Sequence, residues 1–403
     1  MQPDPSRQVH RPDRPRAVIF HASSVPTGRL RVLVDTVRAR LGNSEAWVPP
    51  ALRADRRVRF LLGNQYRILS YVLDWREAWE ASSDVDTALI DVNDALAMAR
   101  APRQLREADL VVVLHSATGY NLRRIRLMER ALQRRKAPLL LFFGNEYMRL
   151  AEKIAFAKSV SAEFIGSQLQ LESARWLYVE SGATVLSLPA ALNPELYRPL
   201  GRPRDVDIGF RGDSYDHAHA LGDVERTSIL QQVKALGPGL GLTVDIEYGR
   251  VDRHIWTALL NRWQGIAGAE SGTYYLERDD RTRQQVIEFL RQQPTADWAA
   301  VRSRFFEGRP IQHSGKAISS RHFEALGTET VQVLVEGRYN DILQPDLHYL
   351  AVRPDLANLE EVLRRFSDES LRRSIARRGR ELALSAHTYQ HRVRSAVKSL
   401  LGH

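Results

Sequence analysis

Short apolar runs alternate with segments of helical periodicity along most of the chain. Amphipathic segments, such as those at 29–41 and 121–136, separate these runs. Short runs rich in β-branched and aromatic residues, separated by helices, are typical of a parallel sheet covered on both faces. In the first half of the chain such runs predict strands at 17–22, 57–62, 87–92, 108–116, 138–146, 162–166 and 184–188.

A proline-rich break at 189–205 divides the pattern into two halves. The alternation then restarts and predicts strands at 206–210, 242–248, 264–268 and 331–336. The fold class is therefore α/β, with two tandem Rossmann-like domains and a deep cleft between them. The predicted boundaries are a disordered tail at 1–16, a first domain at 17–195, a second domain at 196–385 with a polar, helical insertion at about 274–318, and a C-terminal helix at 386–403.

The composition fits a cytoplasmic globular protein. Of the 403 residues 43% are apolar and 26% are charged, and no apolar run is long enough for a membrane span. The chain has no cysteine, which excludes disulfides, thiolate metal sites and a cysteine nucleophile. The net charge of +10 suits polyanionic partners, namely nucleic acid, an anionic membrane surface or phosphorylated ligands.

Ligands of open α/β sheets bind at the carboxyl ends of the strands. In the second domain, the segment SGKAISSRHFEALGT (314–328) leads into a predicted helix. Ser319 and Ser320 are good N-cap residues, and the helix start favours an anion. Lys316 and Arg321 add positive charge, and Glu324 could accept from a ribose diol. The segment predicts a nucleoside-diphosphate site; the alternative is an N-capped helix with a surface ion pair.

Several familiar motifs are absent. A P-loop would need glycine at Pro310 and a hydroxyl residue at Ala317. The segment AESGT (269–273) lacks the first glycine of a nucleophile elbow, and Thr388 replaces the glutamate of a zinc-binding helix. We expect no metal and no cofactor other than a nucleotide-sugar co-substrate.

The stretch SSRHFEALGTETVQVLVEGRYNDIL, the late HTYQHRV (387–393) and VDIGFRGDSYD after the linker resemble the C-terminal half of retaining GT-B glycosyltransferases of the "glycosyl transferases group 1" type. The resemblance covers residues from about 160 to 400. It implies that Glu324 is the glutamate that binds the ribose. It also implies that Glu270, in GIAGAESGT, is the glutamate beside the donor sugar, with the insertion splitting a normally close pair. The alternative for Glu270 is a helix cap.

The resemblance implies two further roles. Arg211 would be a phosphate cation after the first strand of the second domain, or else a surface arginine. His115, at the end of LVVVLHS, would lie near the transferred sugar, or else be structural. Loops after strands of the first domain would face the acceptor; their candidate residues are Ser24, Gly28, Gly119 and Glu146.

The sequence therefore predicts a glycosyltransferase that moves a sugar, with retention, from a nucleotide-diphosphate sugar to an acceptor. The acceptor is expected to be a glycan, a lipid-linked molecule or another cell-envelope molecule, as in polysaccharide biosynthesis. The basic segment 121–136 predicts a helix that could touch an anionic membrane at its inner face; the alternative is an outer helix of the sheet. A nucleotide-sugar epimerase or hydrolase on the same fold, and a basic nucleic-acid-binding protein, remain alternatives, although no nucleic-acid motif is found.

Overall fold

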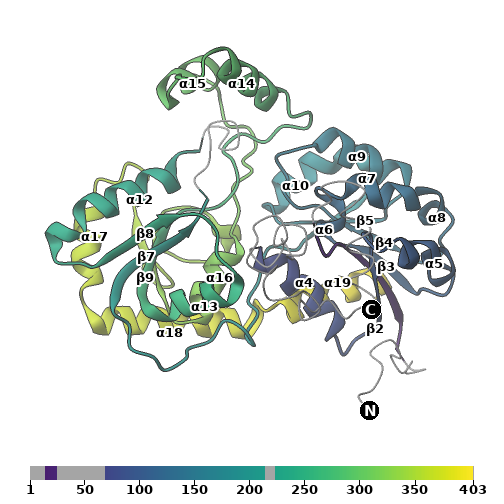
Figure 1. Ribbon diagram of the computed structural model, residues 1–403, viewed down its shortest axis with the longest axis horizontal. Helices are drawn as coiled ribbons and strands as arrows, with labels where there is room; N and C mark the ends of the chain where they lie inside the picture. Colours follow the sequence, from purple (N-terminus) through teal and green to yellow (C-terminus); the bar gives the residue numbers. More distant parts are fainter. Residues whose placement is uncertain (1–13, 25–68, 214–222, 403) are drawn as a thin grey trace, which may run out of the picture.

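The computed structural model describes residues 14–24, 69–213 and 223–402 (Figure 1). The helix predicted at 29–41 and the strand predicted at 57–62 lie outside these residues, as do residues 1–13 of the predicted tail. The last residue of that predicted tail, Arg16, is the first residue of a strand.

The first domain contains a six-stranded parallel sheet in the order β2-β1-β3-β4-β5-β6. The central strands are buried along their whole length because helices cover both faces, as the apolar runs predict. In register, Val18 of β1 lies opposite Ala88 of β2 and Val111 of β3. The strands are β1 (Arg16–His21), β2 (Asp86–Asp91), β3 (Leu110–Val113), β4 (Leu139–Phe142), β5 (Phe164–Ser167) and β6 (Thr184–Ser187).

The second domain contains a five-stranded parallel sheet in the order β11-β10-β9-β7-β8. The edge strand β11 has only three residues, which is too short a run for the sequence pattern to reveal. The two parallel sheets confirm the predicted α/β class. The strands are β7 (Val206–Gly212), β8 (Val244–Tyr248), β9 (Trp263–Gly268), β10 (Val331–Val335) and β11 (Leu350–Val352).

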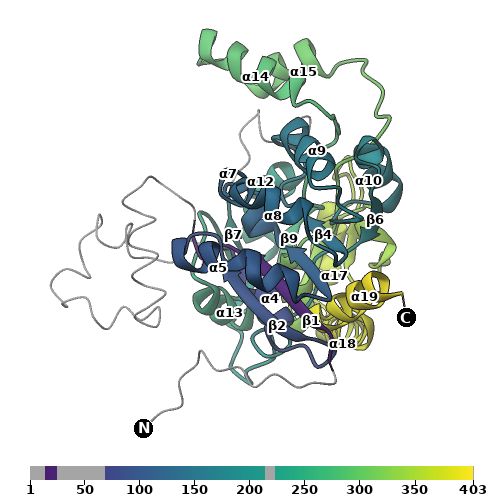
Figure 2. The same ribbon diagram turned by 90° about the vertical axis from the view of Figure 1, so that its right-hand side faces the viewer.

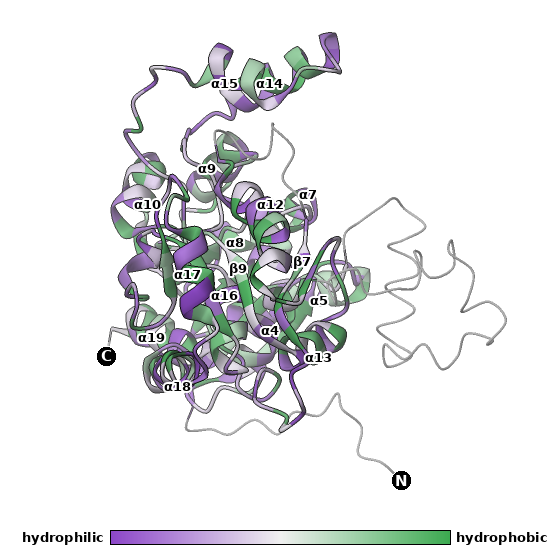
Figure 3. Cartoon of the chain, turned by 90° about the vertical axis from the view of Figure 1, so that its left-hand side faces the viewer, coloured by the Kyte–Doolittle hydropathy of each residue, from purple (hydrophilic) through white to green (hydrophobic). Residues whose placement is uncertain are grey.

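Amphipathic helices cover both sheets, with their apolar sides toward the strands (Figure 3). In α17 (Leu359–Phe366), for example, Leu359, Val362, Leu363 and Phe366 are buried at helical spacing. In the first domain, α5 (Ala95–Arg106), α7 (Leu122–Ile125), α8 (Glu129–Gln133), α9 (Leu150–Ser159) and α10 (Leu171–Tyr178) share one apolar core. In the second domain, α12 (Glu225–Leu236) packs on the same face as α17, while α13 (Arg253–Arg262) and α16 (Ser320–Gly327) lie on the other, and α18 (Glu369–Ala386) packs against α16 and α17.

The chain crosses between the domains twice, and the two crossings lie side by side. Leu192 of the first crossing donates its N–H to His387 O at 2.8 Å and accepts from Tyr389 N at 3.0 Å. After the second crossing, α19 (Tyr389–Leu401) packs with α4 (Ser70–Glu80) on the first sheet. The C-terminal helix is therefore part of the first domain's core, although it follows the second domain in sequence.

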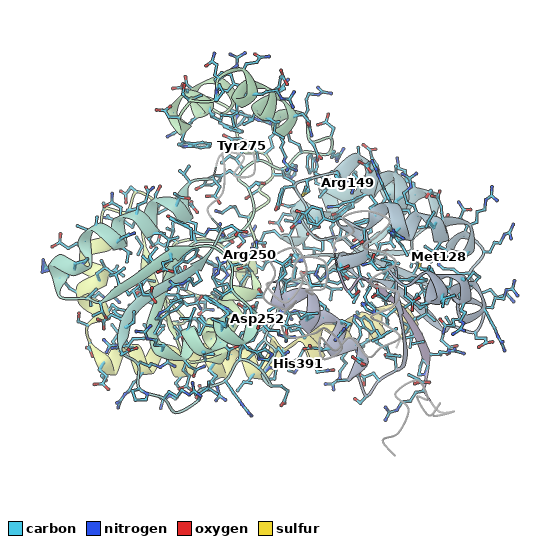
Figure 4. The ribbon with its side chains drawn as sticks, in the orientation of Figure 1. Met128, Arg149, Arg250, Asp252, Tyr275 and His391 are labelled. Atoms are coloured by element: carbon cyan, nitrogen blue, oxygen red, sulfur yellow. The ribbon has the colours of Figure 1, made fainter. Side chains whose placement is uncertain are left out.

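The segment predicted as an insertion forms a helical hairpin that stands above both domains in Figures 1 and 2. Its helices are α14 (Arg281–Gln292) and α15 (Trp298–Phe305), which share a small apolar cluster of their own. Ser271 and Ala317 exchange backbone hydrogen bonds of 2.9 and 2.8 Å, so the hairpin leaves and rejoins the domain at one place. Asp280 accepts from the N–H groups of Arg149 and Leu150, which ties the insertion to the first domain near the Arg149 labelled in Figure 4.

The basic segment at 121–136 is not the single helix that the sequence predicts. It consists of α7, a 3-10 turn η3 (Arg126–Met128) and α8. Arg135 donates to the carbonyl oxygens of Leu132, Val160 and Ser161, so this arginine is tied to the neighbouring loop. Arg123, Arg126 and Arg130 are exposed.

The packing of α19 can be tested by placing a charge on its buried side. Val393 is fully buried against the first sheet, whereas Ser395 on the same helix is exposed. We expect Val393→Asp to destabilise the protein by ~3 kcal/mol or more, because a carboxylate would lose its hydration in an apolar core. Thermal unfolding should show this loss, and Ser395→Asp should leave the midpoint almost unchanged. Equal effects of the two variants would contradict the packing of α19 on the first domain.

Candidate functional site

A cavity of about 220 Å³ lies between the two domains, where the carboxyl ends of both sheets face each other. The first domain contributes residues that follow β4 and β5 and residues at the start of α4. The second domain contributes the last residues of β7, residues that follow β8 and β9, and the start of α16. The described lining residues of the first domain and linker are Leu69, Ser70, Tyr71, Asn145, Glu146, Tyr147, Gln168, Leu169 and Ala190. Those of the second domain are Arg211, Gly212, Arg226, Arg250, Val251, Arg253, Trp256, Ser271, Gly272, Gly315, Ala317, Ile318, Ser319, Ser320, Arg321 and Glu324.

The structure brings only part of the predicted site to this cavity. The residues that do line it are Glu146, Arg211, Ser319, Ser320, Arg321 and Glu324. His115, Glu270, Lys316, Ser24 and Gly119 are not among its lining residues. Gly28 lies outside the described part of the chain.

The start of α16 is built as the sequence predicts. Ser319 is the N-cap residue in an extended conformation, and α16 begins at Ser320. His322 Nδ1 accepts the backbone N–H of Ser319 at 2.9 Å, which fixes the entry of the chain into the helix. The first turn therefore directs backbone N–H groups and the positive end of the helix dipole toward the cavity wall.

Arg321 lies at the junction of α16 and β7. Its guanidinium lies 5.0 Å above the Phe210 ring and beside Gly212. A Cβ on Gly212 would lie 2.6 Å from Arg321 Nη2, so the guanidinium packs closely against the backbone at Gly212. The end of β7 thus holds an arginine against the cavity.

Arg226 and Arg250 are two of the three cavity arginines that the sequence does not predict; the third is Arg253. Arg226, at the start of α12, donates to Asp213 O at 2.7 Å, and Arg250 Nε lies 2.5 Å from Asp213 Oδ2. Figure 4 shows Arg250 on the side of the second domain that faces the first. One acidic residue after β7 therefore fixes two cations that are 24 positions apart in sequence, and no local motif signals this arrangement.

Arg211 lines the cavity, but its charge is already paired. Its guanidinium donates to Asp245 Oδ1 at 2.8 Å and to Asp245 O at 3.0 Å, and Glu247 lies 3.3 Å away. The guanidinium therefore faces β8 and is 12% exposed, whereas the pair of Arg250 with Asp213 is more exposed, with side chains at 35% and 48%. The structure thus gives the predicted role of Arg211 as a phosphate cation less support than it gives Arg250.

The contacts of Lys316 argue against its predicted role as a phosphate cation. Its Nζ lies 2.8 Å from Asp223 Oδ2 and 3.0 Å from Glu225 Oε2, and the side chain is 7% exposed. Burial by itself would lower the pKa of Lys316. The two carboxylates have the larger effect, so the pKa of Lys316 is raised. Two anionic partners leave this ammonium little attraction for a phosphate, so Lys316 ties the start of α12 to the returning end of the insertion.

Glu324 is a buried carboxylate on the wall of the cavity. The indole N–H of Trp256 donates to Glu324 Oε2 at 2.7 Å, which fixes the orientation of the carboxylate. Burial raises its pKa, while Trp256 and Ser320 act in the opposite direction through hydrogen bonds. The carboxylate is thus positioned from two elements, α13 and α16.

Glu270 does not reach the cavity. Its Oε1 accepts the backbone N–H of Tyr339 at 2.7 Å, and a Cβ on Gly337 would lie 2.5 Å from Oε2. Burial raises the pKa of Glu270, and the nearby charge of Lys316 lowers it. The carboxylate therefore caps the short turn at Tyr339–Asp341, which agrees with the alternative reading of Glu270 as a cap and argues against its predicted contact with the donor sugar.

His115 lies behind the cavity wall. It is 4% exposed, and neither ring nitrogen has a hydrogen-bond partner among the described residues. Its ring stacks on Tyr71 with centroids 5.1 Å apart, and burial lowers the pKa of His115 to about 3. The imidazole is therefore neutral, and Tyr71 is the side chain that reaches the cavity at this place.

The first-domain side is held by a buried carboxylate and a buried lysine. Glu146 accepts from Ser167 Oγ at 2.6 Å and from Tyr178 Oη at 2.8 Å. Lys153 Nζ donates to Gly144 O at 2.7 Å and to Asn145 O at 2.9 Å. Burial raises the pKa of Glu146 and lowers that of Lys153 to about 8. Glu146 and Lys153 together fix the loop after β4.

The predicted acceptor-side residues Ser24 and Gly119 are not part of this wall. The backbone oxygen of Ser24 instead accepts a hydrogen bond from the side chain of Asn121.

A buried ion pair joins the domains at the cavity. Arg253 Nη2 lies 2.5 Å from Asp74 Oδ1, and Nη1 lies 2.6 Å from Glu77 Oε1. Asn193 of the linker donates to Asp74 Oδ1 at 2.8 Å, and Ser70 donates to Oδ2 at 2.9 Å. Burial raises the pKa of Asp74 to about 7, against the pull of Arg253. Hydrogen bonds from the second domain, the first domain and the linker thus converge on one carboxylate.

Among the described residues, no group of three or more His, Asp or Glu side chains could hold a metal ion. None of the described helices has the length and hydropathy needed to cross a bilayer.

Residues 245–398 match the family model described as glycosyl transferase-like. No curated protein gives a significant sequence match. Among solved structures, Anabaena HepE in complex with UDP-glucose is 11% identical with a TM-score of 0.46, covering 96% of this chain and 100% of HepE. The DNA-modifying β-glucosyltransferase is 10% identical with a TM-score of 0.49, covering 96% and 99%, and a glycosyltransferase from Rickettsia africae is 12% identical with a TM-score of 0.44 over 96% and 99%.

The ion pair at the domain boundary can be tested by a double-mutant cycle. Arg253→Met should destabilise the protein by ~3–5 kcal/mol at neutral pH, because Asp74 would remain buried without its cation. Arg253→Met combined with Asp74→Asn should recover part of this loss in urea unfolding. An unpaired Asp74 binds a proton in the folded state above its unfolded pKa, so lowering the pH should also stabilise the single variant. Additive effects with no pH response would contradict the pairing.

Residues 245–398 are thus similar to a glycosyl transferase-like family, and the two parallel sheets that face each other across the cavity form the two-domain α/β arrangement that the sequence predicts.

Proposed function

We propose that the protein transfers a sugar from a nucleoside-diphosphate sugar, bound mainly by the second domain, to an acceptor that approaches from the first domain. The observation that carries this proposal is the group of arginines around the first turn of α16. Arg321, Arg226 and Arg250 line the same cavity as the α16 N-terminus, and all come from the second domain. Cations and oriented N–H groups are the partners that a diphosphate needs.

The same arginines would assist the chemistry. As the glycosidic bond breaks, the leaving nucleoside diphosphate gains negative charge, and fixed positive groups stabilise it. Arg226 and Arg250 are held by Asp213, so little reorganisation is needed when that charge develops. We propose that this stabilisation operates without a metal ion.

Glu324 is proposed to accept hydrogen bonds from the ribose hydroxyls. Its carboxylate lines the cavity and is oriented by Trp256. The loop after β4, with Asn145 and Glu146, forms the opposite wall, where the acceptor would bind. Both walls exclude water from the bond being broken, which limits hydrolysis of the donor. Retention of the anomeric configuration is proposed from the resemblance of residues 160–400 to retaining enzymes, and NMR of the first-formed product would test it.

The diphosphate site can be tested by calorimetry with UDP, GDP, ADP and TDP. We expect Arg321→Ala to weaken binding of the accepted diphosphate by ~1.5–3 kcal/mol, the range for a hydrogen bond to a charged group. Arg377→Ala is the matched control, because Arg377 is exposed on α18 and is not among the residues that line the cavity. An unchanged dissociation constant for Arg321→Ala, or no binding of any diphosphate, would contradict the proposed donor site.

A peripheral contact with an anionic membrane, as expected of an enzyme with a lipid-linked acceptor, is proposed for the surface around η3. Leu127 is 71% exposed, and the exposed Arg123, Arg126 and Arg130 surround it in sequence. An apolar side chain among cations suits the headgroup region of an anionic bilayer.

Vesicle sedimentation tests this surface. Replacing Arg123, Arg126 and Arg130 by Gln should reduce pelleting with anionic vesicles, and added salt should do the same for the wild type. Gln at the exposed Arg353, Arg373 and Arg377 removes the same charge from the second domain and should have little effect. Equal losses in both variants would show that only net charge matters and would overturn the assignment to η3.

A further inference from the structure

In the first domain, a stack of aromatic rings holds the side chain of Tyr71 at the cavity. It lies in the first turn of α4 and lines the cavity. Its ring is nearly parallel to that of His115, with centroids 5.1 Å apart and an interplanar angle of 17°. His115 in turn packs on Phe142 of β4 at 5.9 Å, and Phe142 packs on Trp75 at 4.6 Å.

This stack ties Tyr71 to the centre of the first sheet. Trp75 lies one helical turn after Tyr71 on α4, so the stack begins and ends on the same helix. Gly144 packs against His115 closely enough that an added Cβ would lie 3.1 Å from His115 Cβ. His115 is therefore wedged between β4, Tyr71 and the loop at Gly144, and the ring of Tyr71 has little freedom to tilt.

The chemistry of His115 fits a supporting role. Neither of its ring nitrogens has a hydrogen-bond partner among the described residues, although the side chain is almost completely buried. A residue that contacts substrate directly must line the cavity. His115 is not among the residues that line it. What His115 offers the site is a flat ring against which another ring can rest.

The wall that carries Tyr71 faces the arginines of the second domain. Arg321, Arg226 and Arg250 line the cavity from the second domain, and Tyr71 lines it from the first. In a nucleoside-diphosphate sugar, the sugar is attached at the far end of the diphosphate and must be directed toward the acceptor. A sugar bound in this way would reach the first-domain wall. The C–H groups of a pyranose form an apolar face that packs well on an aromatic ring.

We propose that Tyr71 is the residue against which the transferred sugar packs, and that His115 is a positioning residue that supports the Tyr71 ring. This proposal rests on the proposed function, because it needs a nucleotide-sugar in the cavity. It predicts that Tyr71 distinguishes a nucleotide-sugar from the bare nucleotide. It also predicts that His115 can be replaced by another flat ring.

The test compares binding of a diphosphate and of its sugar conjugate to the full-length protein. The probes are the pairs UDP and UDP-glucose, GDP and GDP-mannose, ADP and ADP-glucose, and TDP and TDP-glucose, and the pair that binds the wild type is used. Tyr71→Ala should weaken binding of the nucleotide-sugar by roughly three- to tenfold and leave the diphosphate within about twofold. Tyr71→Phe keeps the ring and should resemble the wild type.

The variants of His115 separate support from chemistry. His115→Phe should keep nucleotide-sugar binding and turnover close to the wild type, whereas His115→Ala should weaken sugar binding as Tyr71→Ala does. Loss of turnover in His115→Phe with unchanged unfolding would show that the imidazole nitrogens act directly, and would overturn the supporting role.

Equal weakening of diphosphate binding and nucleotide-sugar binding by Tyr71→Ala would overturn the assignment of Tyr71. If no diphosphate of the panel binds the wild type, the proposed function itself is contradicted, and the assignment of Tyr71 falls with it.

Discussion

The pairing of Arg253 with Asp74 is the contact on which the arrangement of the site depends. Arg253 belongs to the second domain and Asp74 to the first, and both are almost completely buried. Asn193 of the linker binds the same carboxylate, and Tyr197, also in the linker, donates to Ser70 at 2.6 Å. Two buried charges are costly to desolvate unless their hydrogen bonds are satisfied, so this network favours one relative position of the domains. The two walls of the cavity are fixed with respect to each other for this reason.

Within that frame, the two walls have different chemistry. The second domain supplies arginines that acidic or carbonyl oxygens already orient, as Asp213 does for Arg226 and Arg250. The first domain supplies neutral or anionic groups, namely the stacked ring of Tyr71 and the buried carboxylate of Glu146. A ligand with a diphosphate at one end and a sugar at the other matches this division, since each end meets groups of suitable polarity.

The sequence predicts the fold better than it predicts the site. Apolar runs such as 108–116 and 138–146 predict their strands because a buried parallel strand is apolar along its whole length. The N-cap at Ser319 is also predictable, because a helix start is a local property. The contacts that argue against the predicted role of Lys316 are not visible in the sequence, because its partners, Asp223 and Glu225, lie more than 90 positions away. Arg250 and Arg253 are missed for the same reason: what makes an arginine part of the site here is a partner brought close by folding.

The central claim is that the arginines beside α16 and Glu324 form the donor site. A crystal structure of the protein with the nucleoside diphosphate that binds it would test this claim most directly. The account predicts phosphate oxygens within hydrogen-bond distance of Arg321 and of the first N–H groups of α16, a ribose on Glu324, and Lys316 still paired with Asp223. Phosphates bound by Lys316 after release from Asp223, or a nucleotide outside the cavity, would contradict it.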